Sequence, residues 1–340
     1  MNILLIALHY HDYTNQIAAE LRRAGHMVSL HDIQPRDLGM KVLRVAAASR
    51  WQARLDAHHA SILTAERGRA YDVVMFVQVH QMSQANLAAF RQEFREAKFI
   101  LYNWDSIANH DFRAHAAAFD TVATFDPADA RDYGLLHLPL FCVRGFQTLA
   151  RREQERRGVY FVGNIVSPAR YDAVAAFRDY CEAHGIRLQT HLACTPVVQS
   201  RLLRAGRLPR GVSLSGIAPA RFIDMIETST TVFDFANHQQ TGYTMRVIEN
   251  LCAGKKIITS NRRIRYEPFY TPDRILIFDG LDFSGVADFL AVPLAQPDED
   301  FADFHLQNFL VRLLEGRGHP LPPAQALPAP LPAPLSAVAA

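Results

Sequence analysis

The chain has 340 residues, and its 36 Lys plus Arg against 34 Asp plus Glu give a formal net charge of +2. This near-neutral balance provides no single-sign field for a polyanion, so no nucleic-acid partner is expected. No apolar run approaches the roughly 20 residues that span a bilayer. The four cysteines form no C-x-x-C pair, and the N-terminus lacks the basic segment of a signal peptide, so a cytoplasmic location is expected.

Short apolar runs alternate with helical patterns from the start of the chain. Residues 3–8 form a continuous apolar run, residues 15–24 have helical periodicity, and residues 27–31 form a second apolar run. This βαβ opening predicts a parallel sheet covered by helices on both faces. Further elements of the first domain are expected as a mostly helical segment at 37–68 and strands at 73–79, 99–104, 121–125 and 135–141.

A charged segment without strand character, residues 143–158, interrupts this alternation, and a domain boundary is expected within it. We therefore expect two doubly wound, Rossmann-like α/β domains, at residues 1–150 and 151–315, facing a cleft. Residues 316–340, rich in Pro and Ala, are expected to form a disordered tail. The second domain is predicted to contain strands at 159–162, 186–191, 212–214, 231–235, 256–260 and 275–278, and helices at 168–184, 243–253 and 301–314.

A strand, a polar loop containing Gly242 and a helix follow one another in the second domain. Such a helix start presents free backbone N–H groups and a positive dipole end, which suit a phosphate. Arg246 in the first turn would add a guanidinium, and Glu249 on the same helical face a carboxylate for ribose hydroxyls. The structural alternative is that Thr241 or Thr244 only caps the helix, while Arg246 and Glu249 form a surface pair.

The segment from Gln240 to Arg246, with Glu249 and the strand that ends at Asn261, resembles the donor-site region of GT-B glycosyltransferases. It is most similar to bacterial proteins of capsule, lipopolysaccharide and exopolysaccharide synthesis, which carry a Q-x-G-x-T-x-R-x-x-E core and a K-x-I-T-x-N strand. The same group is matched by YNWDS at 102–106, TFDPADA at 124–130 and FVGN at 161–164.

The resemblance implies a GT-B enzyme, hexosyltransferase-like, that moves a sugar from a nucleotide-sugar donor to a saccharide or lipid-linked acceptor in surface polysaccharide synthesis. The nucleotide-sugar is a substrate, so no cofactor is expected, and such enzymes stabilise the departing diphosphate without a catalytic metal. Many retaining members carry a Glu-x7-Glu pair, and Thr241 stands where its first Glu would be, so the stereochemical outcome stays open. The expected donor-binding residues are Asn164, Gln240, Gly242, Tyr243, Thr244, Arg246, Glu249 and Asn261.

Two loops of the first domain contain candidates for the catalytic base. His11 and Asp12 follow the first strand, and Asp105 follows the fourth. In an inverting transfer, such a side chain removes the proton of the acceptor hydroxyl. His9 and Trp104 are expected to contact the acceptor, since an aromatic face stacks well on a sugar. Asp12 and Asp105 are equally explained as helix caps.

Two other functions remain open. One is a sugar-nucleotide epimerase of the same two-domain build, and the other is a non-catalytic scaffold of a polysaccharide-assembly complex. The absence of the Glu-x7-Glu pair is the feature that leaves the scaffold function possible. Peripheral contact with the inner face of a membrane, through a basic or apolar patch, is also left open, although no amphipathic helix marks it in the sequence.

Overall fold

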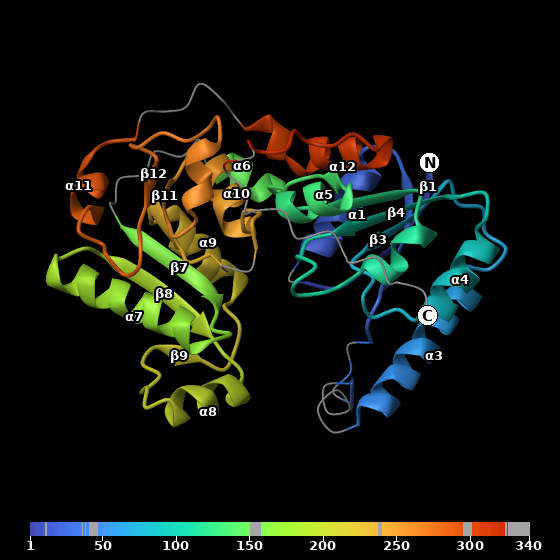
Figure 1. The fold of residues 1–340 in the computed structure, drawn as a ribbon, viewed down its shortest axis with the longest axis horizontal. Coiled ribbons are helices and arrows are strands. Elements are labelled where there is room, and N and C mark those ends of the chain that lie inside the picture. Colours follow the sequence, from blue (N-terminus) through green and yellow to red (C-terminus); the bar gives the residue numbers. More distant parts are fainter. Residues whose placement is uncertain are drawn as a thin grey trace, which may run out of the picture. The chain divides into compact units, whose positions relative to one another are not determined.

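The computed structural model describes residues 1–10, 12–35, 37, 39–40, 47–149, 158–236, 240–294, 301–323 and 325. These residues form two compact units, each built around one sheet (Figure 1). The first unit contains the described parts of residues 1–143, 239–242 and 303–340. The second contains those of residues 144–238 and 243–302.

The first unit has a six-stranded sheet in the order β2-β1-β3-β4-β5-β6, and every pair in it is parallel. All five residues of β3 are buried, as expected for a strand covered on both faces. Its strands are β1 (Asn2–Ala7), β2 (Met27–Asp32), β3 (Val73–Val77), β4 (Lys98–Asn103), β5 (Thr121–Thr124) and β6 (Leu136–His137). Its helices are α1 (Tyr13–Arg23), α3 (Ala48–Glu66), α4 (Gln84–Glu93), η1 (Arg113–Ala118), α5 (Pro127–Tyr133) and α12 (Leu306–Glu315).

The second unit also has a six-stranded parallel sheet, in the order β12-β11-β10-β7-β8-β9. Helices α7, α8 and α9 each begin with a proline, which suits a position whose N–H has no intrahelical acceptor. Its strands are β7 (Val159–Asn164), β8 (Leu188–Ala193), β9 (Val212–Ser213), β10 (Thr231–Asp234), β11 (Lys256–Thr259) and β12 (Ile275–Ile277). Its helices are α6 (Arg144–Leu149), α7 (Pro168–Ala183), α8 (Pro196–Arg204), α9 (Pro219–Glu227), α10 (Met245–Cys252), η2 (Arg262–Tyr266) and α11 (Val286–Ala291); η3 (Ala302–Phe304) spans the passage back to the first unit.

The predicted fold class is confirmed, because each expected apolar run contains a strand of a parallel sheet. The sheet cores are built from these strands and the helices that cover them. In the second unit, for example, Phe177 of α7 stacks on Phe233 of β10 with ring centroids 4.1 Å apart. The polar loops that follow the strands then lie at one edge of each sheet.

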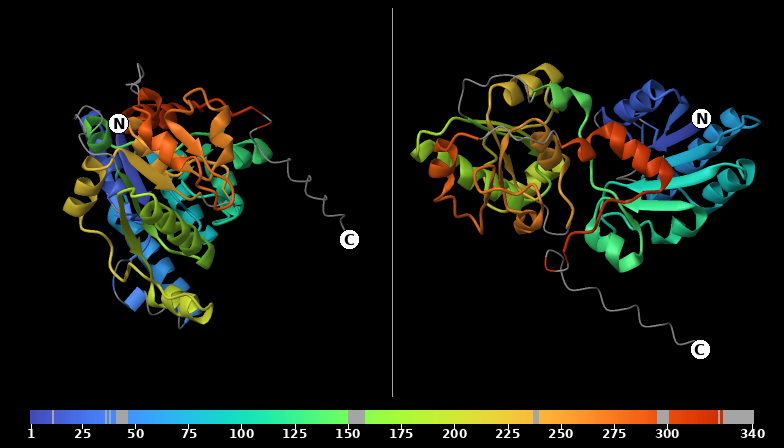
Figure 2. Two further views of the ribbon diagram at one scale, coloured as in Figure 1. Left: turned by 90° about the vertical axis from the view of Figure 1, so that its left-hand side faces the viewer. Right: turned by 90° about the horizontal axis from the view of Figure 1, so that it is seen from above.

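The last helix belongs to the first unit, which differs from the division expected at residues 150 and 315. Helix α12 contacts α1 and β4, and Figure 2 shows it lying along the first unit. The Phe309 ring lies 4.8 Å from the rings of both Tyr102 and Phe141. The apolar face of α12 therefore completes the core of the first unit, a partnership that periodicity alone does not specify.

The start of the expected tail is packed as well. The His319 N–H donates to the carbonyl of His137 in β6 at 2.7 Å. An added Cβ on Gly318 would lie 3.0 Å from the Leu136 side chain, so the chain passes close to this edge strand. Ordered structure thus continues past residue 315, while residues 324 and 326–340 lie outside the described residues.

Replacing Phe309 by Ala is expected to lower the free energy of unfolding by roughly 3–5 kcal/mol, because it opens a cavity among buried rings. Val311 lies on the same helix but is 45% exposed, so Val311→Ala serves as the matched control and should change stability by about 0.5 kcal/mol or less. Urea unfolding measures both. A Phe309→Ala cost below about 1 kcal/mol would show that α12 does not pack on this core.

Candidate functional site

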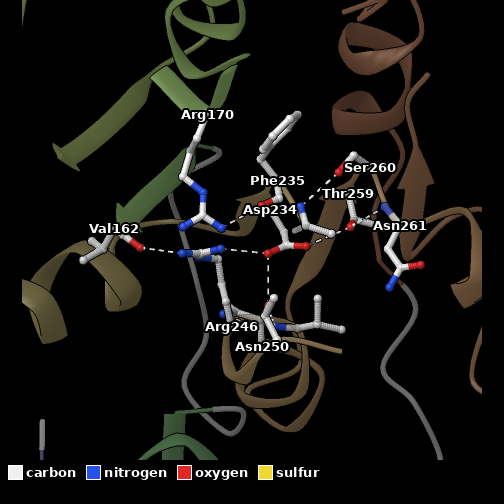
Figure 3. A network of polar contacts seen from close by, with 12 residues as sticks. Val162, Arg170, Asp234, Phe235, Arg246, Asn250, Thr259, Ser260 and Asn261 are labelled. Atoms are coloured by element: carbon white, nitrogen blue, oxygen red, sulfur yellow. Dashed lines mark hydrogen bonds and ion pairs between the residues drawn. The ribbon is translucent and has the colours of Figure 1, made fainter. Parts of the chain in front are cut away.

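A buried carboxylate at the end of β10 joins three segments of the second unit (Figure 3). Asp234 is fully buried. Its Oδ1 accepts hydrogen bonds from Arg246 Nη1 at 2.7 Å and from the Thr244 hydroxyl at 3.1 Å. Its Oδ2 accepts from the Thr259 hydroxyl, the last residue of β11, at 2.9 Å. Asp234 therefore fixes the start of α10 against the ends of two neighbouring strands.

Arg246 is held from two further sides. Its Nη2 donates to the carbonyl of Val162 at 2.8 Å, and its guanidinium carbon lies 4.7 Å from the centre of the Phe161 ring. A Cβ added to Gly163 would lie 2.9 Å from Nη2, so a larger residue there would displace the guanidinium. With 17% of its side chain exposed and five N–H donors in all, Arg246 keeps donors for a ligand in a fixed orientation.

The ion-pair partner of Arg246 differs from the structural alternative given by the sequence. The expected surface pair with Glu249 is replaced by the ion pair with the buried Asp234. Glu249 is itself buried, with 3% of its surface exposed. The sequence placed Arg246 correctly in the first turn of the helix, but nothing local identified Asp234, twelve residues earlier, as its partner.

Thr244 caps α10, as one of the alternatives proposed. Its hydroxyl oxygen accepts from the Val247 N–H at 3.4 Å and donates to Asp234. In an α-helix the first N–H groups have no intrahelical acceptor, and the cap satisfies only that of Val247 here. Among the described residues, no acceptor contacts the N–H groups of Met245 and Arg246, which therefore remain available at the helix start.

The loop before α10 does not present Gly242 to a ligand as expected. Its N–H donates to Asp126 Oδ2 at 3.3 Å, and the Thr241 N–H donates to the same oxygen at 2.6 Å. The Thr241 hydroxyl also donates to Asp126. A Cβ on Gly242 would lie 2.7 Å from both the ring and the carbonyl oxygen of Phe125. Gly242 is therefore required for close packing within the first unit, and its N–H is already bonded.

Asp126 is followed by Pro127, a pair that in the sequence is typical of an N-cap and the first helical position, but Asp126 has a larger role than this cap. It accepts from the N–H groups of Ala128 and Asp129, which confirms the cap of α5. The same buried carboxylate also holds residues 241–242. The Thr241 hydroxyl in turn accepts from the Ala128 N–H at 3.1 Å. Sequence reasoning missed this second role because Asp126 and Thr241 are 115 residues apart.

Of the remaining expected donor residues, Tyr243 precedes α10, whereas Asn261 and Asn164 lie at strand ends. The Tyr243 hydroxyl donates to Glu267 at 2.7 Å, and burial and that carboxylate raise the pKa of Tyr243. Asn261 follows β11 and caps η2 by accepting from the Arg263 N–H. Asn164 is exposed at the end of β7, the same sheet edge as Arg246 and Asn261.

Arg170 is a site residue with only a weak sequence signal. Its guanidinium donates to the carbonyls of Asn164 and Phe235, each at 3.2 Å. It thereby ties the ends of β7 and β10 together beside Asp234, as Figure 3 shows. Its position three residues into a helix that follows a strand is the only local signal for this role.

Of the candidates for the catalytic base, Asp12 has the exposed carboxylate. It is exposed at the start of α1, and its two carboxylate oxygens accept from Asn15 Nδ2 at 2.9 Å and Gln16 Nε2 at 2.7 Å. It makes no side-chain bond to a backbone N–H, so capping does not explain it. Lone pairs therefore remain on both oxygens. His11 lies outside the described residues.

The carboxylate of Asp105 is already hydrogen-bonded within the first unit. One of its oxygens accepts from the Ser106 N–H at 3.1 Å, from Asn109 Nδ2 at 2.7 Å and from Gln240 Nε2 at 2.7 Å. The other faces His110 Nε2 at 3.5 Å. Gln240, expected to bind the donor, thus belongs to the first unit and bonds Asp105. These contacts indicate a positioning role for both residues.

Several aromatic and imidazole rings lie just beyond the carboxyl ends of strands in the first sheet. Trp104 lies 6.2 Å from Tyr10, ring centre to ring centre, and the His9 N–H donates to Asp32. His80 and His110, which sequence reasoning missed, are stacked 4.0 Å apart. Burial, and then the two nearby histidines His110 and His115, lower the pKa of His80 to about 4.

No group of three or more His, Cys, Asp or Glu side chains suited to a metal ion occurs among the described residues. The acidic run at residues 298–300 lies outside them. None of the described helices combines the length and apolar character needed to cross a membrane.

No protein-family model and no curated protein matches the chain. Several solved structures do. An α-glucosyltransferase in complex with UDP and a 13-mer DNA is 9% identical, with 94% of this chain and 96% of that chain covered and a TM-score of 0.60. A glycosyltransferase involved in avilamycin A biosynthesis is 14% identical, with 93% and 96% covered and a TM-score of 0.56.

A UDP-GlcNAc 2-epimerase from Neisseria meningitidis bound to UDP-GlcNAc is 7% identical, with 93% of this chain and 99% of that chain covered and a TM-score of 0.55. At such identities the likeness is one of fold. The chain therefore has the GT-B fold, two Rossmann-like parallel α/β domains, which these glycosyltransferases and epimerases share.

Proposed function

We propose that this protein is a glycosyltransferase that uses a nucleotide-sugar donor. The observation that carries the proposal is Arg246, held by Asp234 at the start of α10, where the ends of β7, β10 and β11 meet. A cation beside free helix N–H groups suits the diphosphate of a nucleotide. Because two of the structural neighbours were solved with UDP or a UDP-sugar, UDP is the first nucleotide to test.

In this proposal the second unit binds the donor and stabilises its leaving group. Negative charge develops on the diphosphate as the glycosidic bond breaks, and preoriented donors lower the free energy of that state. Asp234 offsets part of the positive charge of Arg246. The main contribution of Asp234 is therefore to orient the Arg246 guanidinium before the donor binds. Asn164, Glu249 and Asn261 are proposed as further donor contacts.

Asp12 is proposed as the base that accepts the acceptor proton, with His9 and Trp104 beside the acceptor. The acceptor is proposed to be a saccharide or a lipid-linked saccharide of bacterial surface polysaccharide synthesis, on the strength of the motifs at residues 240–261. Metal independence, a cytoplasmic location and an inverting outcome belong to the same proposal.

A sugar-nucleotide epimerase is the second candidate, because a UDP-GlcNAc 2-epimerase matches the fold as well as the glycosyltransferases do. The two reactions differ in what they consume. An epimerase converts its nucleotide-sugar without any acceptor, whereas a transferase releases the nucleotide only when an acceptor or water takes the sugar. Incubation of the protein with UDP-sugars, with and without saccharide acceptors, distinguishes them by the products formed. A scaffold would bind without turnover.

The donor site is tested by thermal unfolding with UDP, GDP, CMP, ADP and dTDP. A ligand that binds only the folded state raises the free energy of unfolding, by about 2.7 kcal/mol when its concentration is a hundred times Kd, and Tm rises with it. We expect one nucleotide to do so. If none of the five shifts Tm at millimolar concentration, the proposed donor site is wrong.

Asp12→Asn is expected to lower kcat by roughly 10²–10⁴-fold, because the amide cannot accept the proton. It should leave the nucleotide-induced shift in Tm unchanged, since Asp12 does not contact the donor in this proposal. Asp288→Asn, an exposed acid in the first turn of α11, is the matched control and should retain wild-type kcat. Equal kcat in both variants would exclude Asp12 as the base.

A further inference from the structure

The second unit has an arginine-rich surface with exposed aliphatic side chains at the β9 edge of its sheet. Residues 183–223 contain six arginines and no Asp, Glu or Lys. Within this segment, α8 lies beyond β9 in both Figure 1 and Figure 2. Several large apolar side chains of residues 183–223 are exposed, among them Val197 by 58% and Leu203 by 52% on α8, and Leu208 by 71% and Leu214 by 63% after it.

Helix α8 presents one face to its own unit and another to solvent. Leu202 is fully buried and anchors the inner face. Val197, Arg201 and Arg204 recur at spacings of four and three residues, so they share the opposite face, and all three are exposed. Leu203 is exposed on the flank of this face. The outward side of α8 thus mixes cations with aliphatic groups.

The loop after α8 is anchored by hydrogen bonds to α7, and it also combines arginines with an exposed leucine. The Tyr171 hydroxyl of α7 donates to the Leu208 carbonyl at 2.7 Å and accepts from the Arg210 N–H at 2.9 Å. Arg207 forms two 2.6 Å bonds to Asp172, which offsets its charge. An anchored backbone therefore presents the exposed Leu208 side chain instead of folding it inward.

The charge of the other arginines is not balanced locally. Within the described part of the chain, no carboxylate lies within 4.0 Å of the guanidinium nitrogens of Arg201, Arg204 or Arg210. Although the whole protein carries only +2, residues 183–223 carry a formal charge of +6. Such a surface is complementary to a partner that combines many negative charges with an apolar region.

We propose that this surface, here called the α8 surface, binds a bilayer that contains anionic lipids. At the boundary of headgroups and acyl chains, leucines leave water while arginines meet lipid phosphates. A nucleic acid would satisfy the arginines but leave the leucines against phosphates, and the α8 surface offers no aromatic ring for stacking on bases. We define the α8 surface as exposed residues of α8 and of the segment that follows it, namely Val197, Arg201, Leu203, Arg204, Leu208, Arg210 and Leu214.

This inference goes beyond the proposed function and does not depend on it, because binding is measured without turnover. If both are right, the protein works at the surface where a lipid-linked saccharide resides. The α8 surface would then hold the second unit at the membrane, as a peripheral attachment without a spanning segment.

The test is co-sedimentation of the full chain with vesicles of phosphatidylcholine alone or mixed with phosphatidylglycerol. The wild type is expected to bind the mixed vesicles, not the neutral ones, and to dissociate as NaCl is raised. Arg201→Gln with Arg204→Gln should lower the partition coefficient roughly 25-fold, at roughly fivefold for each arginine. Leu203→Ser with Leu208→Ser should lower it roughly tenfold or more at unchanged charge.

Matched controls come from exposed positions outside the α8 surface. Leu281 is an exposed leucine between Asp279 and Asp282, and Arg50 is exposed on α3. Leu281→Ser and Arg50→Gln should leave the partition coefficient unchanged. All the altered side chains are exposed, so wild-type Tm is expected for each variant and is measured in parallel.

Three results would overturn the proposal. The first is no binding to the phosphatidylglycerol vesicles. The second is vesicle binding that neither double variant weakens, which would place the membrane contact elsewhere. The third is binding of a duplex oligonucleotide that the arginine variants lose and the leucine variants keep, without vesicle binding. That result would assign the α8 surface to a nucleic acid.

Discussion

Replacing Arg246 by Ala is expected to abolish the nucleotide-induced rise in Tm and to lower the free energy of unfolding by roughly 3–5 kcal/mol. The stability loss arises because Asp234, fully buried, is left without its cation. The ligand effect arises because the first turn of α10 loses its guanidinium. Urea unfolding and thermal unfolding with UDP measure the two effects separately.

A double variant separates the two roles of Arg246. Asp234→Asn combined with Arg246→Ala removes the uncompensated charge, so part of the lost stability should return, while the nucleotide effect should stay absent. Arg207→Ala, which breaks a pair with the half-exposed Asp172, is the matched control and should cost at most about 1 kcal/mol with nucleotide binding kept. If Arg246→Ala still responds to nucleotide like the wild type, Arg246 does not bind the donor.

Gly242→Ala is expected to destabilise the protein by roughly 1–3 kcal/mol or more. A Cβ there would lie 2.7 Å from the Phe125 ring and carbonyl oxygen, so residues 241–242 must move away from Asp126. That movement strains the hydrogen bonds from Thr241 and Gly242, and it leaves a buried carboxylate with fewer donors.

The control for this variant is Gly216→Ala, because nothing lies within 4 Å of a Cβ at Gly216. It should be neutral or stabilise by up to about 1 kcal/mol, through a less flexible unfolded chain. Equal unfolding midpoints for the two variants would contradict the close packing of Gly242 on Phe125. A larger loss for Gly242→Ala in urea unfolding supports it.

The local elements of this fold follow from patterns within short windows. Continuous apolar runs predicted both parallel sheets, because a strand covered on two faces needs apolar side chains on each. The first-turn position of Arg246 was likewise predicted, and a cap at Thr241 or Thr244 was the structural alternative, since both features depend on neighbours within three residues. The cap at Asp126 belongs to the same class.

The partners of these residues were not predictable in the same way. The glycine at 242 indicated a phosphate loop, but the structure pairs its N–H with Asp126, more than a hundred residues away. A helix at residues 301–314 was predicted, but not that it covers the first unit. Arg246 was expected to meet Glu249 or a ligand, and it also meets Asp234 and the Val162 carbonyl.

By itself, the sequence determined the strands of both sheets, several of the helices, and which strand ends carry polar side chains, because periodicity, caps and turns act over a few residues. Only the tertiary structure decided which carboxylates are already bonded, as Asp105 and Asp126 are, and which remain open, as Asp12 does. It also decided that the leucines around α8 lie in solvent. The physical reason is that exposure and hydrogen-bond pairing depend on segments that the folded chain brings together from distant positions.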